Sequence, residues 1–160
     1  MDRHPAGGPA AIAITWIAAE GCFYVRAQDS VADLERAMTK KCLISVVDDD
    51  QCVREGLEHL IHSMDCYEVA SFASADEYLQ SDVVPHTSCL ISDYQMPGMT
   101  GADLQNRLIA DGYRILTIFL TANCNEENRN RVLNGGALCV LDKPFDEKLL
   151  FEWLKRVCSN

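Results

Sequence analysis

The sequence is poor in basic residues: its 160 residues include 14 lysines and arginines against 24 aspartates and glutamates, a formal net charge of −10. Binding to the phosphate backbone of a nucleic acid needs clustered lysine and arginine side chains, so this composition argues against it. Residues 1–40 carry four basic and five acidic side chains, which leaves a net charge of −9 for residues 41–160. A cation or a basic partner surface suits this second part better than DNA.

The sequence also lacks a convincing membrane or export segment. The apolar run Ala10–Ala19 is shorter than the ~20 residues that cross a bilayer. Its basic flank is Arg3 alone, next to Asp2, and a small-residue cleavage site is absent except around Val25–Ala27. We therefore expect neither a membrane anchor nor secretion.

Cysteine pairs of the Cys-x-x-Cys kind are absent, and no histidine stands near a cysteine at zinc-ligand spacing. Several cysteines fall inside apolar runs, where a reduced thiol packs as a small hydrophobic group. We expect reduced thiols and a cytoplasmic location, with no metal cluster and no disulfide framework. The eight scattered cysteines are Cys22, Cys42, Cys52, Cys66, Cys89, Cys124, Cys139 and Cys158.

The first forty residues differ in composition from the rest, and they begin with a stretch rich in proline, glycine and alanine. Met38 directly precedes the first strand pattern, so one hypothesis is that translation starts there. We expect residues 1–40 to be an N-terminal extension that is disordered or absent from the native product. Residues 41–157 then form one domain, which fits the ~100–200 residues of an ordinary domain, and residues 158–160 form a tail.

From residue 41 onward, short apolar or β-branched runs alternate with longer segments of helical period. This alternation is typical of repeated βαβ units and predicts an α/β fold, a doubly wound parallel sheet of five strands with five helices. Asp50, Ser74 and Asp146 stand where helix N-caps are expected, and Gly135 and Gly136 end the helix before the fifth strand. The expected strands are 42–47, 67–71, 88–92, 115–120 and 137–141.

Polar side chains collect where these strands end. Asp48, Asp49 and Asp50 follow the first strand, Asp93 the third, Thr121 the fourth and Lys143 the fifth. Ligands of doubly wound sheets lie beyond the carboxyl ends of the strands, so we expect these side chains in a single cleft.

Carboxylates held close together repel one another unless a cation joins them or a proton is retained. Mg2+ is the natural candidate, because it prefers oxygen ligands and binds through one or two carboxylates plus a phosphate. One carboxylate of such a site can act as a nucleophile toward a phosphoryl donor, while the metal and an ammonium offset charge on the transferring group.

Four runs resemble the signature blocks of response-regulator receiver domains. They are Val47-Asp48-Asp49, the ten residues from Ser92 to Gly101, Leu120-Thr121-Ala122 and Lys143-Pro144-Phe145. They occur in the order and with the spacing of that family, and the resemblance covers roughly residues 41–157. It implies a flavodoxin-like sheet with strand order 2-1-3-4-5.

The resemblance also implies a role for each site residue. Asp93 is the implied phosphoacceptor, and Thr121 and Lys143 are implied to contact the phosphoryl group. The implied ligands of Mg2+ are Asp48, Asp49, Asp93 and the main-chain carbonyl of Gln95. The resemblance further implies that Pro144 follows a cis peptide bond and that the small Ala122 leaves the acceptor accessible. We interpret Asp50 as a helix cap and not as a site residue.

The implied partners are a histidine kinase or phosphotransfer protein, as the phosphohistidine donor, and a downstream protein that the sequence does not identify. Direct binding to nucleic acid or a membrane is not expected, and homodimers are common in the family. The domain would catalyse its own phosphorylation and dephosphorylation, without a separate small-molecule substrate. Alternatives are a degenerate receiver that binds a partner without phosphorylation, and a Mg2+-dependent phosphohydrolase.

One position departs from the family pattern. Many receivers carry an aromatic residue three positions before the lysine, where this chain has Val140. The usual relay from the threonine to that ring is therefore in doubt. We expect another two-state element to carry the signal, with the polar region Asn123–Asn134 as the candidate.

Overall fold

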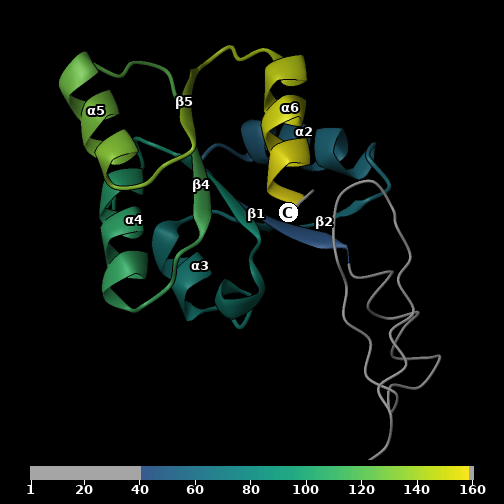
Figure 1. The fold of residues 1–160 in the computed structure, drawn as a ribbon, viewed down its shortest axis with the longest axis horizontal. Helices are drawn as coiled ribbons and strands as arrows, with labels where there is room; N and C mark the ends of the chain where they lie inside the picture. The colour runs from purple at the N-terminus through teal and green to yellow at the C-terminus, as the bar shows by residue number, and fades with distance from the viewer. Residues whose placement is uncertain (1–40, 159–160) are drawn as a thin grey trace, which may run out of the picture. The chain divides into compact units, whose positions relative to one another are not determined.

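The computed structural model describes residues 41–158, which form one five-stranded parallel sheet in the order β2-β1-β3-β4-β5 (Figure 1). This order confirms the flavodoxin-like, doubly wound fold that the sequence predicts. The expectations for residues 1–40, including a start at Met38, lie outside the described residues. The strands are β1 (Cys42–Val47), β2 (Tyr67–Phe72), β3 (Cys89–Asp93), β4 (Leu116–Thr121) and β5 (Cys139–Asp142).

Five α-helices of the described part cover the two faces of the sheet, α2 and α6 on one and α3, α4 and α5 on the other (Figure 1). A short 3-10 turn, η1 (Val84–His86), precedes β3. α6 includes Cys158, which the sequence had placed in a tail. The helices are α2 (Gln51–His62), α3 (Ala75–Gln80), α4 (Gly101–Ala110), α5 (Glu126–Asn134) and α6 (Glu147–Cys158).

The helix starts follow local side-chain chemistry. Asp50 caps α2, because its carboxylate accepts hydrogen bonds from the main-chain N–H groups of Cys52 and Val53. Ser74 caps α3 in the same way through the N–H of Glu77. Both caps were predicted, and they satisfy donors that have no partner inside the helix.

The core lies on both faces of the sheet because neighbouring residues of a strand point to opposite sides. Val46 of β1 belongs to the cluster under α2 and α6, whereas Val47 belongs to the cluster under α3 and α4. Leu150 and Leu154 of α6 are completely buried. Each such side chain contributes about 1.5–3 kcal/mol to stability, so their burial holds α6 against the sheet.

The prediction that all the cysteines are reduced is wrong for one pair. Cys42 and Cys158 form a disulfide across a sequence separation of 116 residues. This pair cannot be predicted from the spacing of the cysteines, because only the doubly wound topology brings the first residue of β1 next to the last residue of α6. Cys22 lies outside the described residues, and the remaining five cysteines carry free thiols, with Cys89 buried as expected.

Among residues 41–158, none of the helices combines the length and the apolar character that a transmembrane segment requires.

Candidate functional site

The parallel pairing of the strands gathers the predicted site residues at one edge of the sheet. β1 and β3 are neighbours, with Val47 paired to Ser92, so Asp48 follows β1 beside Asp93 at the end of β3. β4 and β5 continue the same edge, with Thr121 paired to Asp142. Asp48, Asp93, Thr121 and Lys143 thus leave four different strands at one edge, as the sequence predicts.

Lys143 joins the two buried carboxylates. Its Nζ donates to Asp48 Oδ2 at 2.7 Å and to Asp93 Oδ1 at 3.0 Å. The side chains of Asp48 and Asp93 are 1% and 8% exposed, and that of Lys143 is 21% exposed. The two anions are therefore held close together by a cation that is itself mostly withdrawn from water.

A third carboxylate completes an acidic cluster. Oxygen atoms of Asp48, Asp49 and Asp93 all lie within 4.8 Å of one another. Asp48 and Asp93 are buried, whereas Asp49 is exposed. All three side chains offer oxygen ligands, so this donor set fits a hard divalent cation such as Mg2+, and the exposed side leaves room for the waters that Mg2+ retains.

The protonation of the site follows from burial and charge. Burial raises the pKa of the Asp93 carboxyl, and the neighbouring Asp48 and Asp49 add to the rise, while the hydrogen bond and the charge of Lys143 oppose it. For Lys143, burial acts to lower the pKa, but hydrogen bonds and attraction to Asp48 and Asp93 outweigh it, and the pKa is raised. The ammonium is therefore firmly charged, and it supports the anionic form of Asp93.

The turn after β1 is held by hydrogen bonds that sequence patterns do not reveal. Asp48 Oδ1 accepts from the main-chain N–H of Asp50 at 2.9 Å. Arg54, on the first turn of α2, donates from Nη1 to the main-chain oxygen of Asp48 at 2.7 Å. Both bonds fix Asp48 while leaving its Oδ2 to Lys143. Arg54 was missed because helical periodicity alone places it on the surface of α2.

The loop after β3 begins close to the sheet. The main-chain N–H of Tyr94 donates to Leu120 O at 2.8 Å, and the N–H of Gly101 donates to Tyr94 O at 3.0 Å. Gln95 follows with an exposed side chain, and Gly98 has a φ of +79°, which glycine adopts at little cost. The loop thus returns to α4 immediately beside Asp93.

Thr121 and Lys143 are linked through the main chain. The N–H of Lys143 donates to Thr121 O at 2.7 Å, and the peptide bond between Lys143 and Pro144 is cis, as predicted. The completely buried Thr121 accepts a hydrogen bond at Oγ1 from the N–H of Asn123 at 3.2 Å. Among residues 41–158 its hydroxyl proton has no acceptor and can donate, and the neighbouring Ala122 is exposed.

Comparison with known proteins identifies the family. The sequence model of the response regulator receiver domain matches residues 44–155. The chain belongs to the response regulator receiver family. Nodulation protein W of Bradyrhizobium diazoefficiens is 40% identical to this receiver over 111 residues, which are 69% of this chain and 48% of that protein.

Solved structures agree with the family. The response regulator StyR has 38% identity and a TM-score of 0.66, over 72% of this receiver and 58% of that chain. The Vibrio cholerae chemotaxis protein CheY4 has 28% identity and a TM-score of 0.65, over 73% of this receiver and 98% of that chain. This receiver spans about half the length of the curated relatives that it matches, such as the 48% of Nodulation protein W.

The departure at Val140 has a structural counterpart in this receiver. Val140 is 7% exposed and packs in a cluster with Tyr94, Phe119 and Val132. Its main-chain oxygen accepts a hydrogen bond from Arg129 Nη1 at 2.8 Å. The second terminal nitrogen of that guanidinium, Nη2, donates to both carboxylate oxygens of Asp142, at 2.8 and 2.9 Å. Arg129 of α5 thus binds both the main chain and a side chain of β5. We call these contacts the Arg129 clasp, and the sequence did not predict them.

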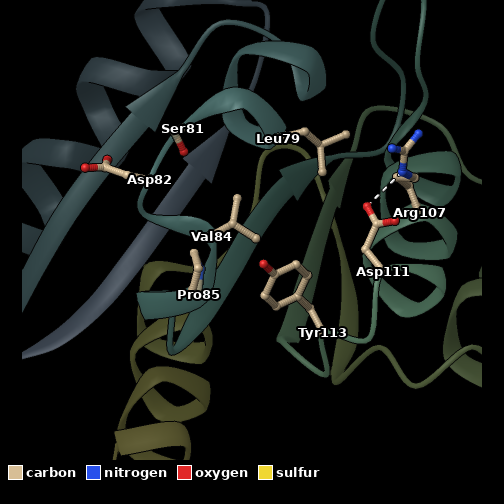
Figure 2. Close-up of a pocket in the computed structure, with 8 residues that line it drawn as sticks. All are labelled: Leu79, Ser81, Asp82, Val84, Pro85, Arg107, Asp111 and Tyr113. Atoms are coloured by element: carbon tan, nitrogen blue, oxygen red, sulfur yellow. Dashed lines mark hydrogen bonds and ion pairs between the residues drawn. The ribbon is translucent and has the colours of Figure 1, made fainter.

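The receiver has a hollow of about 440 Å³, and Figure 2 draws the residues that line it. Arg107 and Asp111 form an ion pair of 2.8 Å at one side of it. None of the predicted site residues lines the hollow, so it does not compete with the strand-end site. Its lining residues are Leu79, Ser81, Asp82, Val84, Pro85, Arg107, Asp111 and Tyr113.

Proposed function

We propose that this receiver accepts a phosphoryl group on Asp93 from a phosphohistidine of a sensor kinase or phosphotransfer protein, in a reaction that depends on Mg2+. The observation that carries the proposal is the double hydrogen bond of Lys143 to Asp48 and Asp93 within a cluster of three carboxylates. A surface lysine or a solvated acidic loop would not produce this geometry, because both carboxylates that Lys143 joins are buried.

Asp93 has one oxygen available for attack. Oδ1 is engaged by Lys143, and Oδ2 has no hydrogen-bond partner among residues 41–158. Oδ2 forms the new bond to phosphorus as the phosphorus–nitrogen bond of the phosphohistidine breaks. The electron pair of that bond stays on the imidazole, which takes up a proton, and Asp93 becomes an acyl phosphate.

Lys143 and Thr121 stabilise the transferring group. The charged Nζ of Lys143 lies at the acceptor carboxylate, where it offsets negative charge on the phosphoryl oxygens. The free hydroxyl proton of Thr121 donates to one of these oxygens. Asp48, Asp49, Asp93 and the carbonyl of Gln95 would hold Mg2+, which supplies further neutralisation of charge at the phosphoryl oxygens.

The output of the receiver is proposed to be a change in protein binding controlled by phosphorylation. The clasp between Arg129 and β5 supports a route for it, because Asp142 immediately precedes Lys143 in the chain. A movement of Lys143 on phosphorylation would shift Asp142, and through the bond of Asp142 to Arg129 it would shift α5. The protein that is bound could be a downstream partner or a second copy of this receiver, and both cases are part of this proposal.

The test is intact-mass analysis of the protein after incubation with a small-molecule phosphodonor, with and without Mg2+. We expect a gain of one phosphoryl mass that requires Mg2+ and is absent from Asp93→Ala. Asp82→Asn, which removes an exposed carboxylate outside the cluster, is the matched control and should be phosphorylated normally. No gain in folded protein under any condition would instead favour a module that binds its partner without phosphorylation.

A further inference from the structure

Cys42 and Cys158 meet at the two ends of the described domain. Cys42 is the first residue of β1 and Cys158 is the last residue of α6. Their sulfur atoms are bonded, and their Cα atoms are 6.1 Å apart. Disulfides usually need a Cα separation of about 4.4–6.8 Å, so the backbone accommodates the bond without displacement.

This pair differs from Cys89 in its access to solvent, and Cys139 is half-buried like the pair. Cys42 and Cys158 are both half-buried, so a small thiol or disulfide can reach them. Cys89 is completely buried, and burial raises the pKa of its thiol to about 12. Burial also raises the pKa of the Cys139 thiol to about 11. Because the thiolate is the reactive form, these two cysteines are protected from exchange.

The bond acts on the end of α6. The apolar face of this helix enters the core through Leu150, Leu154 and Val157, so Val157 is its last buried residue. The last four carbonyl groups of a helix lack partners within the helix, and its last turn frays readily. The disulfide pins this turn to β1, and its opening leaves the turn held by Val157 and the packing of the Cys158 thiol.

We propose that Cys42 and Cys158 are a redox-responsive pair that clamps the end of α6 to β1 when oxidised and releases it when reduced. The oxidant is a low-molecular-weight disulfide of the glutathione class. The thiolate of one cysteine attacks a sulfur of glutathione disulfide, which forms a mixed disulfide and releases one glutathione thiolate. The second cysteine then attacks the sulfur of the first, and the other glutathione leaves.

The electrons and protons of this exchange balance. The two protein thiols lose two electrons and two protons as their sulfur–sulfur bond forms. The glutathione disulfide gains both electrons and both protons and becomes two thiols. Reduction by excess glutathione is the same sequence in reverse, so the ratio of reduced to oxidised glutathione sets the fraction of clamped protein.

The clamp stands apart from the phosphoryl-transfer proposal. Cys42 lies at the start of β1 and Asp48 follows its end, which separates them by roughly 20 Å at about 3.3 Å per residue. We therefore expect oxidation to change the stability of the domain and the motion of α6, while the rate of phosphorylation by a small donor stays the same.

The test uses the full chain, equilibrated in glutathione buffers from fully reduced to fully oxidised and then quenched with acid and an alkylating agent. Peptide mapping by mass spectrometry should show Cys42 linked to Cys158, in a fraction that falls as the proportion of reduced glutathione rises. The melting temperature should be roughly 5–15 °C higher in the oxidised state, because the bond restricts the unfolded chain.

Variants and controls separate the clamp from general oxidation. Cys42→Ser and Cys158→Ser should each abolish the linked peptide and the redox dependence of the melting temperature. Cys52→Ser and Cys66→Ser remove exposed thiols and should change neither. The proposal is overturned if folded protein never forms this link, links other cysteines instead, or keeps the link closed in fully reduced glutathione. Loss of phosphorylation in both redox states would contradict the proposed function and leave the clamp standing.

Discussion

Nζ of Lys143 lies 2.7 Å from Oδ2 of Asp48, although 95 residues separate the two in the chain. The contact places an ammonium where three carboxylates would otherwise repel one another. Asp48 cannot turn to solvent to relieve that repulsion, because its side chain is 1% exposed. Lys143 therefore stabilises the fold as well as serving the proposed chemistry.

Removal of this cation should destabilise the domain. We expect Lys143→Ala to lower the free energy of unfolding by about 2–3 kcal/mol in the presence of a chelator, because two buried carboxylates lose their partner. Mg2+ should raise the stability of the variant by more than it raises that of the wild type, since a cation then replaces the missing charge. Urea unfolding with chelator and with Mg2+ measures both effects.

The control for this variant is Lys148→Ala, which removes an exposed lysine five residues along the chain. It should change the free energy of unfolding by less than about 0.5 kcal/mol. Equal losses for the two variants would mean that the acidic cluster gains no stability from Lys143.

Neutralising the acceptor should have the opposite effect. Burial raises the pKa of the Asp93 carboxyl, so the charged form is disfavoured in the folded state, and Asp48 and Asp49 add repulsion. Asp93→Asn keeps the shape and removes the charge, and we expect a gain of about 0.5–1.5 kcal/mol without divalent ions, together with complete loss of phosphorylation. Thermal melts in chelator measure the gain, and an unchanged or lower stability would show that Lys143 already offsets the repulsion.

Gly101 should tolerate no side chain. A Cβ at this position would collide with the main-chain oxygen of Asp93 and would lie 2.9 Å from the ring of Phe119. We expect Gly101→Ala to cost about 1–3 kcal/mol and to slow phosphorylation, because the relief of the collision moves Asp93. Urea unfolding and the phosphodonor assay report the two effects.

Gly56 is the matched control for Gly101. It also lies in a helix, but apart from the backbone of that helix a Cβ there would meet no atom of the described residues within 4 Å. Gly56→Ala should stabilise the domain by up to about 1 kcal/mol, because alanine favours the helix. If both substitutions changed stability in the same direction, close packing beside Asp93 would not explain the glycine at position 101.

The clasp of Arg129 should restrain α5. Within this helix only Val132 is buried, so few apolar contacts hold it to the sheet. We expect Arg129→Ala to accelerate hydrogen exchange of the amides in Glu126–Asn134, with less than about 1 kcal/mol lost globally, because Asp142 is 65% exposed. Hydrogen exchange followed by mass spectrometry makes this measurement.

Arg131→Ala provides the comparison for Arg129, because it removes an exposed arginine from the same helix. It should leave the exchange of α5 close to that of the wild type. Identical exchange in both variants would exclude a restraining role for the Arg129 clasp.

Much of the fold was predictable because its determinants are short-range. Asp50 and Ser74 mark helix starts through bonds to N–H groups two or three residues away, and these caps were read correctly. The alternation of buried strands with helices predicted the parallel sheet. Strand ends were less exact: β3 begins at Cys89 and includes Asp93, one residue later at each end than expected.

By itself, the sequence determined the alternation of strands and helices, and it placed Asp48, Asp49, Asp93, Thr121 and Lys143 at the strand ends, where the structure also has them. Only the tertiary structure decided which side chains touch. Lys143 pairs with Asp48 and Asp93 across 95 and 50 residues, and Cys42 bonds to Cys158 across 116. Local propensities act over a few residues, whereas these contacts follow from the order in which the strands pair and the faces on which the helices pack.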